Sequence, residues 1–263
     1  MKNCLHELTV ASVFVLFLVA LMAHGCASAP VQRQGEIPAK RPVSEIVKPD
    51  VQYVIDAFDP WEGMNRRIYK FNALFDKYLF LPVVSAYEWI TPDFVQTGVS
   101  NFFNNLHEIK PLSNALLQFK MAKFEMTLSR IVINTTIGMG GLLDVATLEI
   151  PRQDEDFGQT LGFYGLGPGP YLVIPVLGPS TLRDTGGLVL DAAAYDAMID
   201  EIMDELDMDS NDDEDRLKAG LTVLDGIDTR HQQGFRYYAT GSPFEYDLIR
   251  RLYLEAREFQ VAH

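Results

Sequence analysis

The sequence predicts a mainly α-helical protein, and three features of its pattern support that prediction. Apolar residues recur at steps of three and four along most of the chain, which is the spacing of one face of an α-helix. Proline and glycine interrupt these periodic stretches repeatedly, so the helices are expected to be short and kinked. Only Tyr171-Leu172-Val173-Ile174 has the composition of a short strand.

The N-terminus has the pattern of a secretory leader. Residues 10–22 form an apolar run broken only by Ser12, too short for a bilayer span of about 20 residues but suited to a signal peptide. The run is followed by Ala23-His24-Gly25-Cys26, which resembles a lipobox. The sequence thus predicts a lipoprotein signal peptide over residues 1–25 and acylation, for example with palmitate, at Cys26. Ala23 stands where Leu is usual, so an ordinary secretory leader is the alternative.

The cysteine count agrees with lipidation. The chain has two cysteines, and Cys4 would leave with the leader, so no disulfide can form within the mature chain. Ala27 follows Cys26 in place of the Asp that retains enteric lipoproteins at the inner membrane, which favours anchoring to the periplasmic leaflet of the outer membrane. Residues 26–55 are rich in Pro, Ala and charge and read as a flexible tether. Residues 56–263 are expected to form one helical domain.

Hydrophobic periodicity places most of the helices within that domain. Pro82 is expected to stop the first helix, and Asp93 and Ser242 are candidate N-caps. The region 157–183 is rich in glycine and proline yet strongly apolar, and it is expected to be one long, packed, irregular segment. The predicted helices are 64–80, 83–90, 93–106, 111–119, 120–137, 184–206, 214–231 and 242–259.

Charge excludes some partners. The net charge of −14 disfavours nucleic-acid binding, which needs a basic surface against phosphate. It also disfavours electrostatic docking on anionic headgroups, so any lipid contact should be mainly apolar. The broad apolar face of residues 120–137 fits either a protein core or a lipid interface, and periodicity alone does not decide between them.

No pattern in the chain supports catalysis, and we expect no cofactor and no metal site. The sequence lacks a G-x-S-x-G motif, and the spacing of His107, His231 and His263 suggests no catalytic triad. The acidic run that begins at Asp207 resembles the opening of an EF-hand, but Asp212 stands where the loop requires glycine. The glycine-rich stretches lack the spacing of phosphate-binding loops. The protein is therefore expected not to be an enzyme.

Several motifs occur together and in order between residues 55 and 257, with weaker matches at Ile227-Asp228-x-Arg230 and Ser242-Pro243-Phe244. The stronger motifs are Asp59-Pro60-Trp61-Glu62-Gly63-Met64-Asn65-Arg66 with Phe71-Asn72 and Asp76; Ser100-Asn101-Phe102-Phe103-Asn104-Asn105-Leu106 with Asn114 and Gln118; Arg130, Asn134, Thr136, Gly138, Gly140, Gly141 and Asp144; and Asp156-Phe157-Gly158-Gln159-Thr160-Leu161-Gly162 with Tyr164, Gly169-Pro170-Tyr171, Leu177-Gly178-Pro179-Ser180 and Arg183-Asp184. Together they resemble the MlaA (VacJ) lipoprotein family. Phe119 departs from the family pattern, which commonly has glycine after Gln118.

The resemblance implies a fold, a function and partners. The fold would be a ring-like assembly of short, kinked helices within the inner leaflet of the outer membrane, around a central amphipathic channel. Phospholipid mislocalised to the outer leaflet would pass through that channel to a periplasmic lipid carrier, which maintains outer-membrane lipid asymmetry. A trimeric porin would be a further partner.

The resemblance also supplies candidate channel-lining or structural residues, for which ordinary helix capping and buried hydrogen bonding are the alternative role. These candidates are Asp59, Asn65, Arg66, Asn72, Asn101, Asn105, Arg130, Asn134, Asp144, Asp156, Gln159, Tyr171, Arg183 and Asp184. The glycine-rich region 138–170 is the candidate mobile element that controls the channel, with Gly138, Gly140, Gly141, Gly158 and Gly162 as its glycines.

Three classes of function therefore compete on the sequence. A phospholipid-transport channel is the leading hypothesis. An envelope scaffold that binds porins without moving lipid is the second, and a lipid hydrolase is the third. Headgroup specificity, the direction of lipid flow, the identity of the porin and the role of the acidic residues 200–215 are not predicted.

Overall fold

The structure is a computed structural model that describes residues 57–205, 211–239 and 241–263, except for the side chains of residues 211–214. The predicted signal peptide, Cys26 and the predicted tether lie outside the described residues. The residues from Ala57 to His263 form one compact unit.

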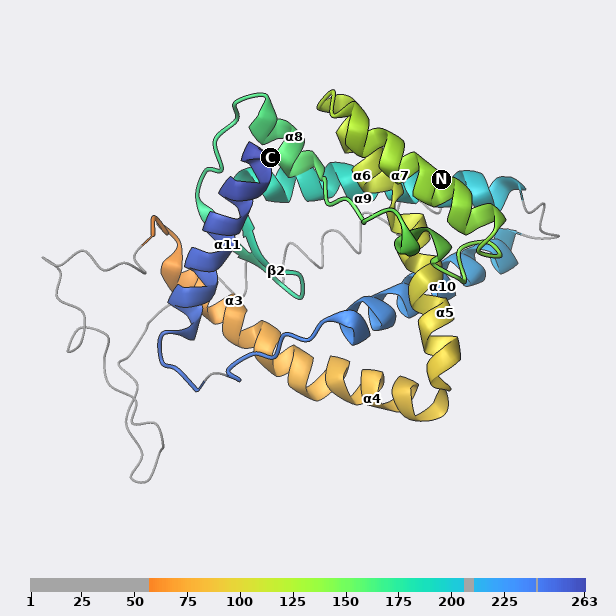
Figure 1. Cartoon of the computed structure of the whole chain (residues 1–263). Helices are drawn as coiled ribbons and strands as arrows, with labels where there is room; N and C mark the ends of the chain where they lie inside the picture. Colours follow the sequence, from red (N-terminus) through yellow and green to blue (C-terminus); the bar gives the residue numbers. More distant parts are fainter. Residues whose placement is uncertain (1–56, 206–210, 240) are drawn as a thin grey trace, which may run out of the picture. The chain divides into compact units, whose positions relative to one another are not determined.

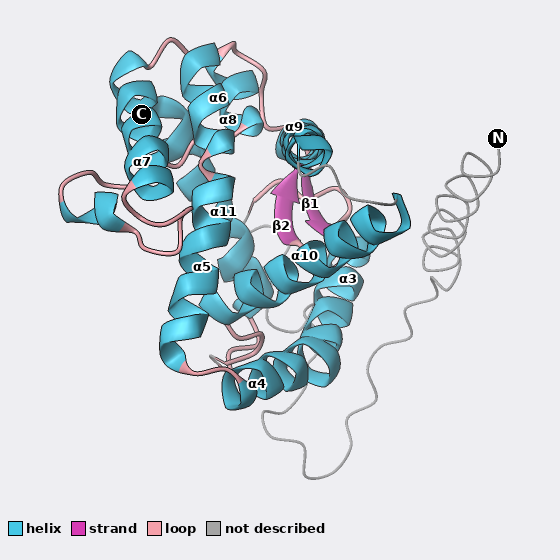
Figure 2. Ribbon diagram, turned by 90° about the vertical axis from the view of Figure 1, so that its right-hand side faces the viewer, coloured by secondary structure: helices cyan, strands magenta, loops and turns pink. Residues whose placement is uncertain are grey.

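The described chain is mainly helical, as the sequence predicts (Figures 1 and 2). Its helical elements are α3 (Glu62–Phe75), the π-helical turn η1 (Asp76–Phe80), α4 (Leu81–Ile90), α5 (Asp93–His107), α6 (Ile109–Leu117), α7 (Met121–Thr136), the 3₁₀ turn η2 (Val145–Leu148), α8 (Phe157–Phe163), α9 (Leu182–Glu205), α10 (Asn211–Gln232) and α11 (Glu245–Ala262). Strands β1 (Tyr171–Ile174) and β2 (Gly178–Thr181) form an antiparallel hairpin that pairs Tyr171 with Thr181.

The expectation that Pro82 ends the first helix is wrong. The chain passes from α3 through η1 into α4 without leaving a helical conformation, and Pro82 lies in the first turn of α4. A π-helical turn widens the hydrogen-bonding register just before the proline, so the amide hydrogen that Pro82 lacks is not required there. Pro92 does mark a boundary, because α4 ends at Ile90.

Region 157–183 is more regular than the sequence suggests, because it contains a helix and a second strand. The side chain of Asp156 accepts a hydrogen bond from the Gln159 amide (2.8 Å) and so caps α8. Gly158 and Gly162 hid this helix from the sequence pattern, yet both are required by close packing against neighbouring side chains. Strand β2 was hidden by Pro179, which an edge strand tolerates.

Two predicted helix caps are also wrong. Pro92, and not Asp93, occupies the N-cap position of α5, and no side chain caps that helix. Phe244 occupies the N-cap position of α11, while the Ser242 hydroxyl accepts a hydrogen bond from the Phe244 amide (3.2 Å) in the turn before the helix. Both polar residues thus lie one or two positions away from the true cap.

Helix α3 holds the hairpin through two asparagine side chains. Asn65 donates to the Tyr171 carbonyl (3.0 Å) and accepts from the Val173 amide (2.9 Å). Asn72, two turns further along, donates to the Ile174 carbonyl (2.9 Å) and accepts from the Val176 amide (2.7 Å). The edge of α3 thereby satisfies backbone groups of β1 as a third strand would. Figure 2 shows the hairpin between α3 and α9.

The distribution of polar and apolar side chains is inverted relative to an ordinary globular domain. Among the described residues, twenty-three buried side chains are polar or charged and only eleven are hydrophobic. Thirty-eight large hydrophobic side chains in the same part of the chain are exposed, including Trp89 at 86%, Phe94 at 79% and Leu148 at 80%. Extensive exposed apolar surface marks a site of contact with a membrane or another protein. No helix within the described ranges is long and apolar enough to cross a bilayer.

Helix α8 packs closely on α9, and this contact allows a test of the fold. A Cβ added at Gly187 would lie 2.3 Å from the Gly158 backbone nitrogen, whereas one added at Gly186 meets nothing within 4 Å. Gly187→Ala should therefore lower the free energy of unfolding by about 1–3 kcal/mol or more. Gly186→Ala should raise it by about 0.5–1 kcal/mol, because alanine favours the helix. Thermal unfolding followed by circular dichroism measures both, and equal effects would contradict the described packing.

Candidate functional site

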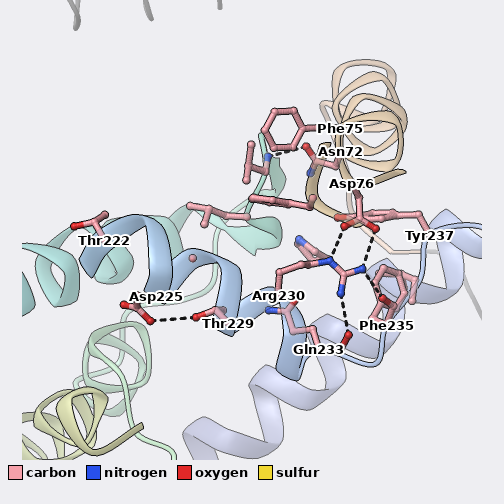
Figure 3. Close-up of a pocket in the computed structure, with 16 residues that line it drawn as sticks. Asn72, Phe75, Asp76, Thr222, Asp225, Thr229, Arg230, Gln233, Phe235 and Tyr237 are labelled. Carbon is pink, nitrogen blue, oxygen red and sulfur yellow. Dashed lines mark hydrogen bonds and ion pairs between the residues drawn. The ribbon is translucent and has the colours of Figure 1, made fainter. Parts of the chain in front are cut away.

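A cavity of about 550 Å³, here called the Arg230 cavity, opens beside the turn of the hairpin (Figure 3). Apolar side chains from several elements form much of its wall, while Asp76 and Arg230 place a buried ion pair on it. The lining residues are Asn72, Phe75, Asp76, Phe80, Val176, Leu177, Pro179, Thr222, Asp225, Gly226, Thr229, Arg230, Gln233, Phe235, Tyr237 and Ile249.

The ion pair joins the π-helical turn η1 to the end of α10. The Arg230 guanidinium donates through Nε to Asp76 Oδ1 (2.5 Å) and through Nη2 to Asp76 Oδ2 (2.9 Å). Its remaining donors reach the carbonyls of Gln233 (2.8 Å) and Phe235 (3.1 Å). Hydrogen bonding to Asp76 raises the pKa of Arg230, outweighing the opposing effect of burial, so Arg230 keeps its charge. The wall of this cavity thus carries a buried ion pair whose donors and acceptors are bonded to each other and to nearby carbonyls (Figure 3).

A second cavity of about 420 Å³, here called the Lys110 cavity, shares Leu177 and Pro179 with the first. The two cavities therefore meet at the hairpin. This cavity is much more highly charged, with acidic and basic groups from α6, α9 and α11 and from the N-cap of α8. The lining residues are Lys110, Asp156, Ile174, Leu177, Pro179, Ser180, Asp184, Leu188, Asp191, Tyr253, Ala256, Arg257 and Gln260.

Arg257 of α11 holds two of the aspartates of the Lys110 cavity. It contacts Asp156 through Nη1 (2.7 Å) and Nη2 (2.8 Å), and Asp184 through Nε (3.1 Å) and Nη2 (3.0 Å). Burial alone would raise the pKa of each carboxyl, but the hydrogen bonds and charge of Arg257 outweigh it. The pKa of both Asp156 and Asp184 is therefore held below its ordinary value. Arg183 and Tyr253 also contact Asp184.

The predicted site residues of the first motif hold α11 against α3. Asp59 accepts from the Asn65 amide (2.8 Å) with one oxygen, and from the Tyr246 hydroxyl (2.5 Å) and Arg250 (3.2 Å) with the other. Arg66 pairs with Asp247 (2.7 Å) and lies over the Tyr246 ring. Asp59, Asn65 and Arg66 line neither cavity, whereas Asn72 and Asp76 of the same motif line the Arg230 cavity.

The third motif forms a buried ionic cluster between α6, α7 and η2. Arg130 is 1% exposed and contacts Glu108 (2.8 Å) and both oxygens of Asp144 (3.1 Å). Asn134 donates to Asp144 (2.9 Å) and accepts from the Ala146 amide (2.9 Å). The geometry of Arg130, Asn134 and Asp144 is that of buried hydrogen bonding, the alternative role that the sequence left open.

The remaining predicted residues fix individual segments. Gln159 donates to the Asp154 carbonyl, and Arg183 pairs with Asp184. Tyr171 is fully buried in the small hydrophobic cluster. On α5, Asn101 donates to the Leu142 carbonyl (3.0 Å) and Asn105 to the Thr135 hydroxyl (3.0 Å).

Four of the five predicted loop glycines are tightly packed. A Cβ at Gly138, Gly141, Gly158 or Gly162 would lie less than 3.0 Å from a neighbouring heavy atom. Gly140, with φ +73°, has open space around it. These glycines thus allow close approach of segments, and control of a channel by region 138–170 stays a prediction.

Sequence reasoning missed several residues that line the cavities. Lys110, Asp191 and Arg257 were not singled out, and Asp76 and Arg230 were noted only within motifs. Each is a charged residue within an otherwise amphipathic helix, which is a weak signal. The ion pairs that define their roles join positions 73 to 154 residues apart, so their partners could not be read from the sequence.

Buried charges, cavities and an extensive exposed apolar surface define a class of protein whose surface contacts a membrane or another protein. The particular family follows from comparison with known sequences. The model of the MlaA lipoprotein family matches residues 57–260, so the chain belongs to this family.

Relatives and a solved structure agree with that family. The chain is 41% identical over 138 residues to the intermembrane phospholipid transport system lipoprotein MlaA of Escherichia coli K12, and 34% identical over 149 residues to that of Haemophilus influenzae. These alignments cover 51% and 55% of this chain and 55% and 59% of the relatives, so the chain spans little more than half of their length. A solved structure, described as "Structural basis for maintenance of bacterial outer membrane lipid asymmetry", matches 78% of this chain and all of its own with a TM-score of 0.58 at 32% identity.

The Arg257 cluster predicts a pH-dependent loss of stability. Arg257→Gln should lower the free energy of unfolding at pH 7 by about 3–5 kcal/mol, because the buried carboxylate of Asp184 and the partly buried one of Asp156 lose their cation. Arg257 lowers the pKa of both aspartates, so its stabilising effect is present at neutral pH and is lost as the pH falls through those lowered values. The difference between variant and wild type should therefore shrink as the pH approaches about 4 and below.

Arg251→Gln on the same helix is the matched control. Arg251 makes only an exposed pair with Glu255 (2.6 Å), so its loss should cost less than about 1 kcal/mol. Denaturant unfolding of both variants at neutral and acidic pH provides the comparison. A loss for Arg257→Gln that does not depend on pH would contradict the described ion pairs.

Proposed function

We propose that this protein is an outer-membrane lipoprotein that removes mislocalised phospholipid from the outer leaflet and passes it to a periplasmic carrier. The observation that carries the proposal is the inverted distribution of side chains, with charges inside, apolar groups outside and two neighbouring cavities that share Leu177 and Pro179. A path for phospholipid needs this combination, because a polar headgroup and apolar acyl chains must be accommodated together. Lipid asymmetry of the outer membrane would be the result of this transport.

The exposed apolar side chains support placement within one leaflet. Trp89, Ile90 and Phe94 lie at the turn between α4 and α5 and are all more than 70% exposed. In water this surface would be costly, whereas lipid acyl chains would cover it favourably at about 25 cal/mol per Å². Acylated Cys26 would then be a second attachment to the periplasmic leaflet.

The order of contacts between elements supports a ring-like channel. Helix α3 continues into η1 and α4, α4 packs on α10, α10 on α9, α9 on α8, and α8 on α11. Helix α11 returns to α3 through the pair between Arg66 and Asp247 and the hydrogen bond between Tyr69 and Glu245. The helices that line the Arg230 cavity all belong to this closed series of contacts. The hairpin also lines the cavity, and it packs on α3, α9 and α11.

The alternative is an envelope scaffold that binds a trimeric porin without moving lipid, because exposed apolar surface also suits protein partners. One protein can both bind a porin and transport lipid. The two alternatives differ in whether the function of the protein requires an open cavity. A substitution that fills the Arg230 cavity and leaves the outer surface intact separates them.

Gly226 of α10 offers that substitution. It lines the Arg230 cavity, and a Cβ added there meets nothing within 4 Å. Gly226→Phe should therefore occupy the cavity without displacing backbone. In a strain that lacks its own copy of the gene, this variant should fail to restore low outer-leaflet phospholipid and detergent resistance.

Gly220→Phe is the matched control, since Gly220 lies on the same helix, lines no described cavity and also has open space around it. This variant should restore both properties to the wild-type level at equal expression. Full activity of Gly226→Phe would contradict the channel proposal and favour the scaffold. Release of fatty acid from phospholipid by the purified protein would favour a hydrolase.

A further inference from the structure

The Lys110 cavity contains one basic and one acidic side chain that no opposite charge contacts. Asp156 and Asp184 share Arg257, so their charges are balanced within the wall. Lys110 and Asp191 line the same cavity and lack such a balance. A cavity with one available cation and one available anion is complementary to a ligand that carries both charges.

Lys110 is half-buried at the start of α6. None of the described residues lies within hydrogen-bond or ion-pair distance of its ammonium group. Its charge nevertheless acts on the acidic groups of the cavity: it adds to the effect of Arg257 in lowering the pKa of Asp156, and it partly offsets the rise that burial causes in the pKa of Asp191. The ammonium group thus faces the cavity with its three donors available.

Asp191 of α9 is held in place by neutral donors alone. One carboxylate oxygen accepts from the Asn114 side-chain amide (2.9 Å) and the other from the Phe157 backbone amide (2.9 Å). Burial, aided by the negative charge of Asp156, raises the pKa of Asp191 above its ordinary value. A carboxylate has about four acceptor positions, so each oxygen retains capacity for a further hydrogen bond.

We propose that the Lys110 cavity is a headgroup subsite for zwitterionic phospholipid, in which Lys110 binds the phosphate and Asp191 binds the ammonium of phosphoethanolamine. This subsite rests on the proposed lipid-transport function and gives it a preferred substrate class.

The donor and acceptor chemistry favours ethanolamine over other headgroups. A primary ammonium donates hydrogen bonds to a carboxylate, whereas quaternary choline has none to donate and is recognised by aromatic cages. Tyr253 is the one aromatic residue that lines this cavity. An anionic headgroup such as phosphoglycerol would meet Asp191 without offering a counter-charge, which disfavours it.

The neighbouring Arg230 cavity suits the other half of the same lipid. It meets the Lys110 cavity at Leu177 and Pro179, and Phe75, Phe80 and Ile249 contribute apolar wall. A headgroup in the Lys110 cavity would therefore leave acyl chains beside an apolar surface. The position of the hairpin between the two cavities sets the boundary between headgroup and chains.

The test measures which lipid the full-length protein retains. Wild-type protein is incubated with vesicles of equimolar phosphatidylethanolamine, phosphatidylglycerol and phosphatidylcholine with identical acyl chains, re-purified, and its bound lipid is analysed by mass spectrometry. We expect phosphatidylethanolamine to be enriched about three- to tenfold over each competitor, the range for one or two charge-assisted hydrogen bonds.

Variants assign the enrichment to the two side chains. Asp191→Asn should abolish the preference for phosphatidylethanolamine while total bound lipid persists. Lys110→Gln should lower the binding of all three lipids, and Lys110→Arg should restore it. Lys70→Gln, an exposed lysine on α3, is the matched control and should change nothing. Circular dichroism and thermal unfolding verify that each variant is folded.

The outcomes separate the subsite from the proposed function. Bound lipid with the composition of the vesicles, or enrichment that survives Asp191→Asn, would overturn the headgroup subsite while transport itself stands. Wild-type protein that retains no phospholipid would overturn both.

Discussion

Buried charges in this protein must find partners on distant parts of the chain, and the fold depends on that constraint. Asp59 meets Arg250, Asp76 meets Arg230, and Arg257 meets both Asp156 and Asp184. Each pair joins segments that are far apart in the sequence. Removing one member leaves an isolated buried charge, at a cost of about 3–5 kcal/mol, so every pair makes its contact nearly obligatory. The hydrophobic cluster, by contrast, contains only five fully buried side chains among the described residues.

This arrangement fits the environment that we propose. Between helices surrounded by acyl chains, burying apolar surface against protein gains little over burying it against lipid. Polar and ionic contacts, close packing at glycines such as Gly158 and Gly187, and asparagine bonds to the hairpin then become the interactions that specify the fold. The same polar interior leaves space beside the hairpin, where an apolar cavity and a charged cavity meet. The polar interior therefore both specifies the fold and leaves room for an amphipathic ligand.

The sequence predicted the helical class, most helix positions and the family, because periodicity and short motifs are local signals. It identified Asn65, Asn72, Arg130 and Asp184 as polar residues of interest, but it left open what they contact. The partners that tie them to other elements lie 14 to 108 residues away, and only the tertiary structure brings them together. Helix α8 and strand β2 were missed because their glycines and proline serve packing between elements, which overrides local propensity. Lys110 and Asp191 were missed because an unbalanced charge is recognisable only once every neighbour is known.

The central claim is that the exposed apolar surface is covered by lipid. Trp89 reports on it directly, because it is 86% exposed and shares the chain with only one other tryptophan, Trp61. The measurement is the fluorescence of Trp89 in a Trp61→Phe variant reconstituted into vesicles whose phospholipids carry bromine on the acyl chains. Embedding in a leaflet predicts blue-shifted emission and strong quenching by the bromines. Emission at the wavelength of tryptophan in water, without quenching, would contradict the account.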